Sequence, residues 1–225
     1  MLMNKKVVVF APHPDDESLG CGGTLLKHKS LGHEVHWCIV TDMSASDAYT
    51  QEQKKQRVNT VEQVAKLYEF DSVINLGFQP AGLDNVPMGQ LLNALKDTLE
   101  SIKPDTLYLP YAFDVHSDHK VVYQAIISVT KTFRAPYVSS IICYETLSET
   151  DYGLSPLNTQ FQPNMYVDTS EYIEQKHQIL KCYESEMQTH PFPRSFKAVE
   201  ALEVLRGSQA FVDAAEAFVI LRQRW

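Results

Sequence analysis

Short apolar segments alternate with longer amphipathic ones along the first two thirds of the chain, and this alternation limits the folds that the chain can adopt. The apolar segments that we expect to be strands are residues 6–10, 33–40, 73–76, 106–109 and 139–144. The segments that we expect to be helices are residues 18–31, 50–68, 88–102 and 119–132. Strands that alternate with helices form right-handed βαβ units. We therefore predict an α/β fold with a mostly parallel sheet and helices on both faces.

The pattern changes from Glu149 onward, where regular alternation gives way to long polar and Pro-containing loops. The segments of this part are a loop over 149–163, a strand near 165–167, a helix over 171–186, a Pro-rich turn over 189–195, a helix over 196–205 and a strand or short helix over 215–222. Neither repeats nor a linker interrupt the chain. We expect one domain, 1–225, in which 149–225 is a C-terminal elaboration that shapes the mouth of the site.

Composition and charge exclude several classes of partner. The chain has 225 residues, 44% of them hydrophobic, and a formal net charge of −8. Nucleic acids and anionic membranes need basic patches, so neither is expected as a partner. The four cysteines show no C-x-x-C spacing and are expected to be reduced. We find neither a signal peptide nor an apolar run near the ~20 residues of a membrane span, so we expect a cytoplasmic protein; a homo-oligomer stays open.

The segment FAPHPDDESLGCGG, residues 10–23, crowds one histidine and three acidic residues directly after the first predicted strand. Adjacent carboxylates repel one another, so this segment needs a positive group nearby, either a metal ion or a basic side chain, unless it is exposed and screened by water. The glycines that follow do not match G-x-G-x-x-G, and no Gly-Lys-Ser/Thr follows them. We interpret them as sites of close packing between a helix and the sheet.

A second polar loop, PYAFDVHSDHK over 110–120, follows the strand predicted at 106–109. Sites on open parallel sheets form beyond the carboxyl ends of the strands, so the two loops can meet there. His13, Asp16 and His119 would then supply two imidazoles and one carboxylate, a donor set that suits catalytic zinc or non-haem iron. Taken alone, the first loop could be a turn with first-turn acids and an N-cap at Ser18, and the second a solvated helix start.

Several stretches together resemble the LmbE-like, PIG-L-type family of zinc-dependent N-deacetylases. They are APHPDDESLGCGGTL, VTD at 40–42, NLGF at 75–78, HSDH at 116–119 and AEAF at 215–218. The resemblance implies a Rossmann-like fold, a divalent metal (Zn²⁺ or another ion such as Fe²⁺) and removal of N-acetyl groups from amino sugars.

By motif position, the resemblance assigns the metal to His13, Asp16 and His119. It makes Asp15 the general base, and it makes His116, held by Asp118, the group that stabilises the oxyanion. The chemistry agrees, because an amide is a poor electrophile, and zinc polarises a carbonyl and lowers the pKa of bound water to about 7. We expect Asp118 to fix the tautomer of His116 and to raise the pKa of its imidazole.

The chain departs from the family pattern near the expected substrate site. Arg57 is present, but Thr60 replaces the Glu of an R-x-x-E helix, and Ala81 follows a Leu-Gly segment where an acidic residue is common. We expect substrate contacts from Arg57, His190 and Arg194.

The partner predicted from these residues is a small N-acetylated sugar, either free or carried on a nucleotide or another glycan precursor, whose phosphate Arg57 and Arg194 would bind. The alternatives are another metal-dependent amidase or esterase, and a non-catalytic sugar-binding protein.

Overall fold

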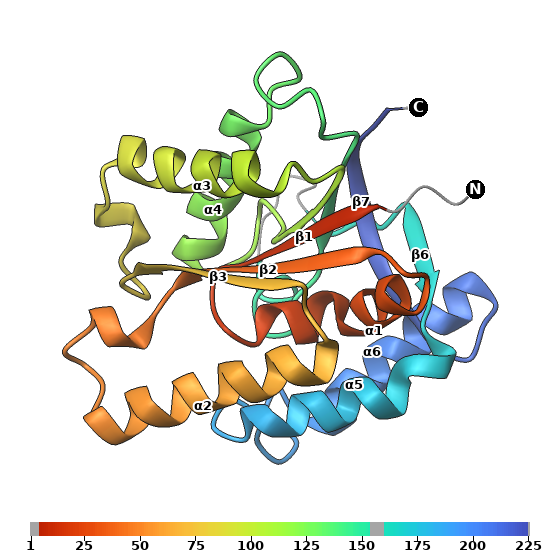
Figure 1. Ribbon diagram of the computed structural model, residues 1–225. Coiled ribbons are helices and arrows are strands. Elements are labelled where there is room, and N and C mark those ends of the chain that lie inside the picture. The colour runs from red at the N-terminus through yellow and green to blue at the C-terminus, as the bar shows by residue number, and fades with distance from the viewer. Residues whose placement is uncertain (1–4, 154–159, 225) are drawn as a thin grey trace.

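The computed structural model describes residues 5–153 and 160–224 and places all its strands in one seven-stranded sheet (Figure 1). The order across the sheet is β3-β2-β1-β4-β5-β7-β6. The bounds are Lys6–Ala11 for β1, Glu34–Thr41 for β2, Ser72–Phe78 for β3, Thr106–Leu109 for β4, Ser140–Tyr144 for β5, Met165–Asp168 for β6 and Ala215–Gln223 for β7. Strands β1 to β5 pair in parallel. The α/β fold with a mostly parallel sheet is therefore confirmed.

Helices cover both faces of this sheet (Figure 1). The two on one face are α3 (Met88–Ile102) and α4 (Ser117–Val129). Those on the other face are α1 (Asp16–Ser30), α2 (Gln51–Tyr68), α5 (Ile173–Leu180) and α6 (Phe196–Ala210). Short 3₁₀ turns lie at Met43–Ala45, Leu83–Asn85, Ser170–Tyr172 and Lys181–Tyr183.

The central strand β1 explains why its sequence is continuously apolar. Val8 and Phe10 belong to the core cluster that packs under α3 and α4, whereas Val7 and Val9 belong to the cluster on the α1 face. All four side chains are fully buried. A strand covered on both faces needs apolar residues at every position, so it shows no alternation.

The C-terminal part differs in detail from the predicted elements. Strand β7 pairs antiparallel with β5, and β6 pairs antiparallel with β7, so both extend the same sheet beyond β5. The helix expected over 171–186 is shorter, because α5 is flanked by 3₁₀ turns. Residues 154–159 of the predicted loop over 149–163 lie outside the described residues.

Two predicted features of composition can be checked in the described part of the chain. All four cysteines are free, and three of them are buried. None of the helices described here is both long and apolar enough to cross a membrane.

The glycines of the first motif let α1 pack closely against the sheet and its neighbours. A Cβ atom at Gly20 would lie 2.3 Å from Cδ2 of Tyr144, and one at Gly23 would lie 2.7 Å from Cγ2 of Thr169. The backbone of α1 also departs from helical geometry at Cys21, between two of these glycines. The interpretation of the glycines as packing residues is confirmed.

We expect Gly20→Ala to destabilise the protein by about 1–3 kcal/mol, because the added methyl group overlaps a ring that cannot withdraw. The Tyr144 hydroxyl donates a hydrogen bond to the carbonyl of Phe10, which fixes the ring. The midpoint of urea unfolding measures the effect. The matched control is Gly89→Ala in α3, where a Cβ atom meets nothing within 4 Å. Equal midpoints for both variants would contradict the packing argument.

Candidate active site

The site lies where the carboxyl ends of β1 and β4 meet. These strands are parallel neighbours, with Val9 paired to Tyr108. The chain leaves β1 through His13 and enters α1 at Asp16, and it leaves β4 through a loop that enters α4 near His119. Helix α1 begins two residues earlier than predicted, because Asp16 and Glu17 occupy its first turn, where the helix dipole favours acids. Ser18 therefore lies inside the helix and is not its N-cap.

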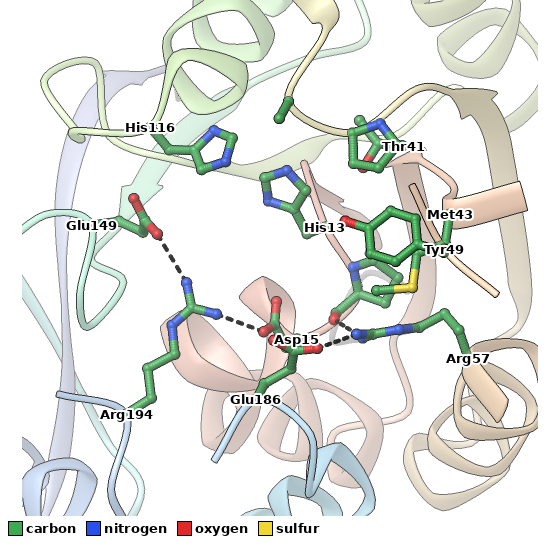
Figure 2. Close-up of a pocket in the computed structure, with 13 residues that line it drawn as sticks. His13, Asp15, Thr41, Met43, Tyr49, Arg57, His116, Glu149, Glu186 and Arg194 are labelled. Carbon is green, nitrogen blue, oxygen red and sulfur yellow. Dashed lines mark hydrogen bonds and ion pairs between the residues drawn. The ribbon is translucent and has the colours of Figure 1, made fainter. Parts of the chain in front are cut away.

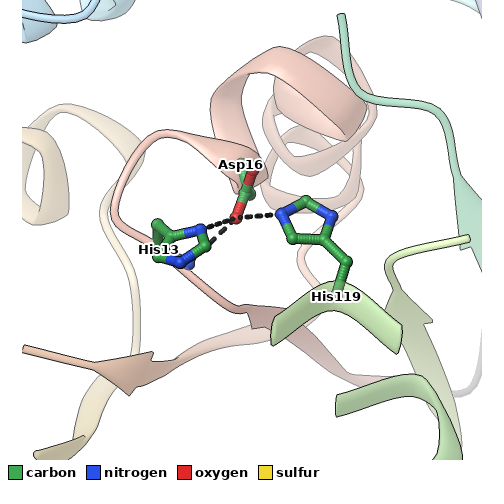
Figure 3. Close-up of side chains that lie close together, drawn as sticks. All are labelled: His13, Asp16 and His119. Atoms are coloured by element: carbon green, nitrogen blue, oxygen red, sulfur yellow. Dashed lines mark hydrogen bonds and ion pairs between the residues drawn. The ribbon is translucent and has the colours of Figure 1, made fainter. Parts of the chain in front are cut away.

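Three side chains converge at this edge, as Figure 3 shows. The ligand atoms of His13, Asp16 and His119 all lie within 4.8 Å of one another. Oδ2 of Asp16 lies 3.4 Å from Nδ1 of His13 and 3.2 Å from Nε2 of His119. The structure thus brings together the three residues that the sequence analysis selected, and their role as metal ligands stays a prediction.

The donor atoms in this cluster fit a cation. Nε2 of His119 and Oδ1 of Asp16 are buried and have no hydrogen-bonding partner among the described residues. Buried polar atoms almost always have a hydrogen-bonding partner. Unpaired nitrogen and oxygen atoms on converging side chains therefore point to a missing partner. Two imidazoles and one carboxylate can hold a divalent metal ion and leave coordination positions open.

Each of the two histidines turns its other ring nitrogen toward a buried carboxylate. Nδ1 of His119 lies 2.8 Å from Oδ2 of Asp114, and Nε2 of His13 lies 3.0 Å from Oδ2 of Asp118. A carboxylate that accepts the N–H of a ligating histidine fixes its tautomer and directs the free nitrogen at the metal. Sequence reasoning missed Asp114; the available signal was an acidic residue in the same loop, five positions before His119.

The charges of the cluster are strongly coupled. Burial lowers the pKa of His13 and of His119, but the nearby carboxylates outweigh burial and raise these pKa values to about 9 and about 10. For Asp16, burial raises the pKa, and the two imidazoles overcome it and hold that pKa well below its usual range. Without a metal, both rings are therefore protonated on both nitrogens at neutral pH and carry a positive charge.

The predicted partnership between Asp118 and His116 is corrected by the structure. The Asp118 carboxylate accepts hydrogen bonds from the backbone N–H groups of Ala81 and Leu83 in addition to its contact with His13. His116 instead accepts the backbone N–H of Asp118 at Nδ1. Burial and the charges of His13 and His119 lower the pKa of His116 to about 4, since they outweigh Asp118, which does raise this pKa as expected. His116 is a neutral imidazole with its proton on Nε2.

Asp15 lies beside the cluster in a strained conformation. Its φ of 139° is rarely adopted by residues other than glycine, and such strain costs about 1–3 kcal/mol. The side chain is buried, and burial raises the pKa of Asp15 to about 7 against the opposing charge of Arg194. Within the part of the chain that the structure describes, Oδ1 of Asp15 has no hydrogen-bonding partner.

Both arginines that we expected to contact substrate are engaged by the protein itself (Figure 2). Arg194 binds Oδ2 of Asp15 at 2.8 Å and Oε1 of Glu149 at 2.9 Å, and its Nε donates to Oγ of Ser148. Arg57 donates to the carbonyl of Pro14 at 2.8 Å and pairs with Glu186.

His190, the third predicted contact, is exposed and is not among the residues that line the pocket. The expectation that it contacts substrate is therefore not supported.

A pocket with a volume of about 190 Å³ opens beside the cluster (Figure 2). Its lining combines the predicted site with side chains that the sequence did not single out. The lining residues are His13, Pro14, Asp15, Thr41, Met43, Tyr49, Arg57, Pro80, Ala81, His116, Glu149, Glu186 and Arg194. No sequence signal marked Glu149 or Glu186, because each pairs with an arginine far away in the chain.

The family model of the GlcNAc-PI de-N-acetylases, PIG-L, matches residues 8–130, which is more than half of the chain. The chain belongs to the PIG-L family. The matched region contains both loops that build the His/Asp cluster, and it ends before Glu149, Glu186 and Arg194.

Individual proteins agree with the family assignment. An uncharacterized deacetylase of Escherichia coli, YaiS, is 25% identical over 64% of this chain and 75% of its own length. Diacetylchitobiose deacetylase of Thermococcus kodakarensis is 24% identical over 81% of this chain and 70% of its own length. The solved structure of N,N′-diacetylchitobiose deacetylase of Pyrococcus horikoshii superposes with a TM-score of 0.78 at 22% identity, covering 97% of this chain and 84% of that chain. This superposition on the Pyrococcus horikoshii structure shows that the two chains share a fold.

We expect binding of one zinc ion at pH 7 to release about two protons, because both imidazoles are protonated without metal and ligate as neutral rings. Below about pH 9 the affinity should therefore rise about 100-fold for each pH unit. Calorimetric titrations in buffers of different ionisation enthalpy count the protons.

Asp114→Asn should weaken zinc binding about 10–100-fold, because Asp114 orients the ring of His119. The proposed metal site would be contradicted if zinc bound without releasing protons, or if zinc did not bind.

Proposed function

We propose that this protein is a zinc-dependent N-deacetylase of a small amino-sugar derivative. The observation that carries the proposal is the cluster of His13, Asp16 and His119 with a further buried carboxylate, Asp15, beside it in an open pocket. When bound, zinc would supply a Lewis acid that polarises the amide carbonyl and lowers the pKa of a water molecule. The same donor set also suits Fe²⁺, so metal analysis decides between them.

Asp15 has the properties of the general base. Its Oδ2 is held by Arg194, while Oδ1 is free to accept a proton. Its pKa of about 7 is close to neutral pH, where a base of this kind is most effective. Asp15 would take a proton from the attacking water and later give it to the leaving amine.

His116 would stabilise the negative charge that develops on the carbonyl oxygen. Its Nδ1 accepts the N–H of Asp118, so the neutral ring presents Nε2–H as a donor. A fixed donor aimed at the developing oxyanion lowers the barrier without becoming charged itself. A neutral donor thus takes the place of the imidazole with a raised pKa that we expected from the sequence.

The pocket favours a neutral N-acetyl sugar over a phosphate-bearing carrier. Among the described residues that line it, the two basic side chains with permanent charge, Arg57 and Arg194, are each paired with carboxylates. A phosphate would have to displace those carboxylates. Two relatives are named for diacetylchitobiose, a neutral N-acetyl sugar, which agrees with this preference.

The C-terminal part of the chain supports the expectation that it shapes the mouth of the site. Glu149, Glu186 and Arg194 all line the pocket and all lie after residue 148. An assay of acetate and free amine separates the proposal from its alternatives. An N-deacetylase releases both products together, whereas an esterase releases no amine and a sugar-binding protein releases neither.

Asp15→Asn should retain zinc and the fold but lose about 10²–10⁴-fold in kcat, the usual contribution of general acid–base catalysis. The amide cannot take the proton, whereas the three ligand side chains are unchanged. Amine release from N,N′-diacetylchitobiose and elemental analysis measure the two effects. Asp97→Asn, an exposed acid on α3, is the control. Near-normal turnover in Asp15→Asn would remove the proposed base.

We expect kcat/KM for a nucleotide-linked N-acetylglucosamine to be no higher than for the free sugar, because the pocket arginines are already paired. The two compounds are compared under identical metal loading. A preference of tenfold or more for the linked form, lost in Arg57→Ala, would show that Arg57 leaves Glu186 to bind phosphate and would contradict the neutral-substrate proposal.

A further inference from the structure

Glu17 is a fully buried carboxylate that the proposed mechanism does not use. It lies in the first turn of α1, next to Asp16, and it does not line the pocket. A carboxylate removed from water is costly unless hydrogen bonds replace its hydration, so its partners must supply those bonds.

Those partners connect three parts of the chain. Oε1 of Glu17 accepts hydrogen bonds from Oγ of Ser18 at 2.6 Å and from the hydroxyl of Tyr183 at 2.7 Å. The hydroxyl of Tyr68 donates to Oγ of Ser18 at 3.0 Å. Tyr68 belongs to α2 and Tyr183 to the 3₁₀ turn after α5, so the carboxylate is fixed from both sides.

The other oxygen of Glu17 reaches the residue that we assign as the base. Oε2 accepts the backbone N–H of Asp15 at 3.1 Å. The N–H groups at the start of a helix lack partners in the helix itself, and Asp15 makes no side-chain cap. The carbonyl of Asp15 meanwhile accepts the N–H groups of Ser18 and Leu19, which are the first bonds of α1.

Asp15 is thus held both at its backbone and at its side-chain carboxylate. Its backbone has a φ of 139°, which a residue with a Cβ atom keeps only where its surroundings impose it. Its carboxylate is held by Arg194. We propose that Glu17 is a positioning residue: by accepting the N–H of Asp15 it holds that strained backbone, and through it the Oδ1 atom of the base, at the pocket. The inference rests on the proposed role of Asp15.

A pair of conservative variants separates the reach of Glu17 from its charge. Glu17→Gln keeps the length of the side chain, and its amide oxygen can still accept the N–H of Asp15 while its NH₂ donates to hydroxyls that can reverse direction. Glu17→Asp keeps the charge but shortens the side chain by one methylene and withdraws the acceptor. Positioning therefore predicts that Gln is tolerated and Asp is not. An effect of the negative charge alone predicts the reverse.

The experiment measures kcat and KM for N,N′-diacetylchitobiose with each variant, at measured and equal zinc content. We expect kcat to fall about 10–100-fold in Glu17→Asp, since a displacement of about 1 Å can cost 10²-fold, and KM to change less than about twofold. Glu17→Gln should stay within about threefold of wild type. Val129→Ala, which truncates a buried side chain in the last turn of α4 outside this network, is the control for lost stability alone.

The same substitutions in an Asp15→Ala background complete a double-mutant cycle. If Glu17 acts through Asp15, Glu17→Asp should cost less than about twofold once the carboxylate of Asp15 is gone. A loss as large as in wild type, or a loss in Glu17→Gln equal to that in Glu17→Asp, would overturn the inference and leave Asp15 as the base. Unchanged turnover in Asp15→Ala itself would overturn the proposed base and the inference with it.

An independent measurement does not need a substrate. Glycine adopts a φ of 139° freely, so Asp15→Gly removes the strain that Glu17 is proposed to hold. Glu17→Asp should then lower Tm less in the Asp15→Gly background than in wild type. An equal loss of Tm in both backgrounds would show that Glu17 stabilises the fold without holding Asp15, and would overturn the inference.

Discussion

The position of Asp16 between two imidazoles is the interaction on which the site depends. Burying an isolated carboxylate costs far more than a domain can supply, so three consecutive acids can enter the protein only if each finds its own partners. Asp16 faces His13 and His119, Asp15 faces Arg194, and Glu17 accepts two hydroxyls and a backbone N–H. The first turn of α1 separates the three side chains by pointing them in different directions, and this converts mutual repulsion into three distinct environments.

These environments draw on the whole length of the chain. The family match over residues 8–130 covers the metal-binding candidates, but Arg194 and Tyr183 come from the C-terminal part, which joins the sheet through β6 and β7. The residues that would bind the metal therefore lie within the matched region, whereas the side chains that hold the carboxylates of Asp15 and Glu17 come in part from the C-terminal part. Changes in the C-terminal part can alter the pocket and the alignment of Asp15 while the cluster of His13, Asp16 and His119 stays intact.

The fold and the candidate ligands were predictable because they follow from local pattern. Apolar runs and helical periodicity fix the βαβ units, and parallel strands bring their carboxyl ends to one edge, which places His13 near His119. The pairings were not predictable. Arg194 and Asp15 are 179 positions apart, and neither periodicity nor spacing records such a contact. The family resemblance assigned Asp118 to His116, but the helix turns the Asp118 carboxylate toward His13 and the loop at Ala81.

Protonation can compensate the buried carboxylates of the cluster where no metal is bound. In the metal-free protein, protonated His13 and His119 together carry the same charge as a divalent cation, and they compensate Asp16 and part of the charge of Asp114 and Asp118 behind them. Because their folded pKa values of about 9 and 10 exceed the usual 6.5, this stabilisation is complete below pH 6.5 and is lost as the pH rises through those values. A metal ion would replace the two protons and keep Asp16 compensated where the imidazoles alone no longer can. A metal ion and the protons would thus compete for one site, because the buried carboxylates need positive charge from one or the other.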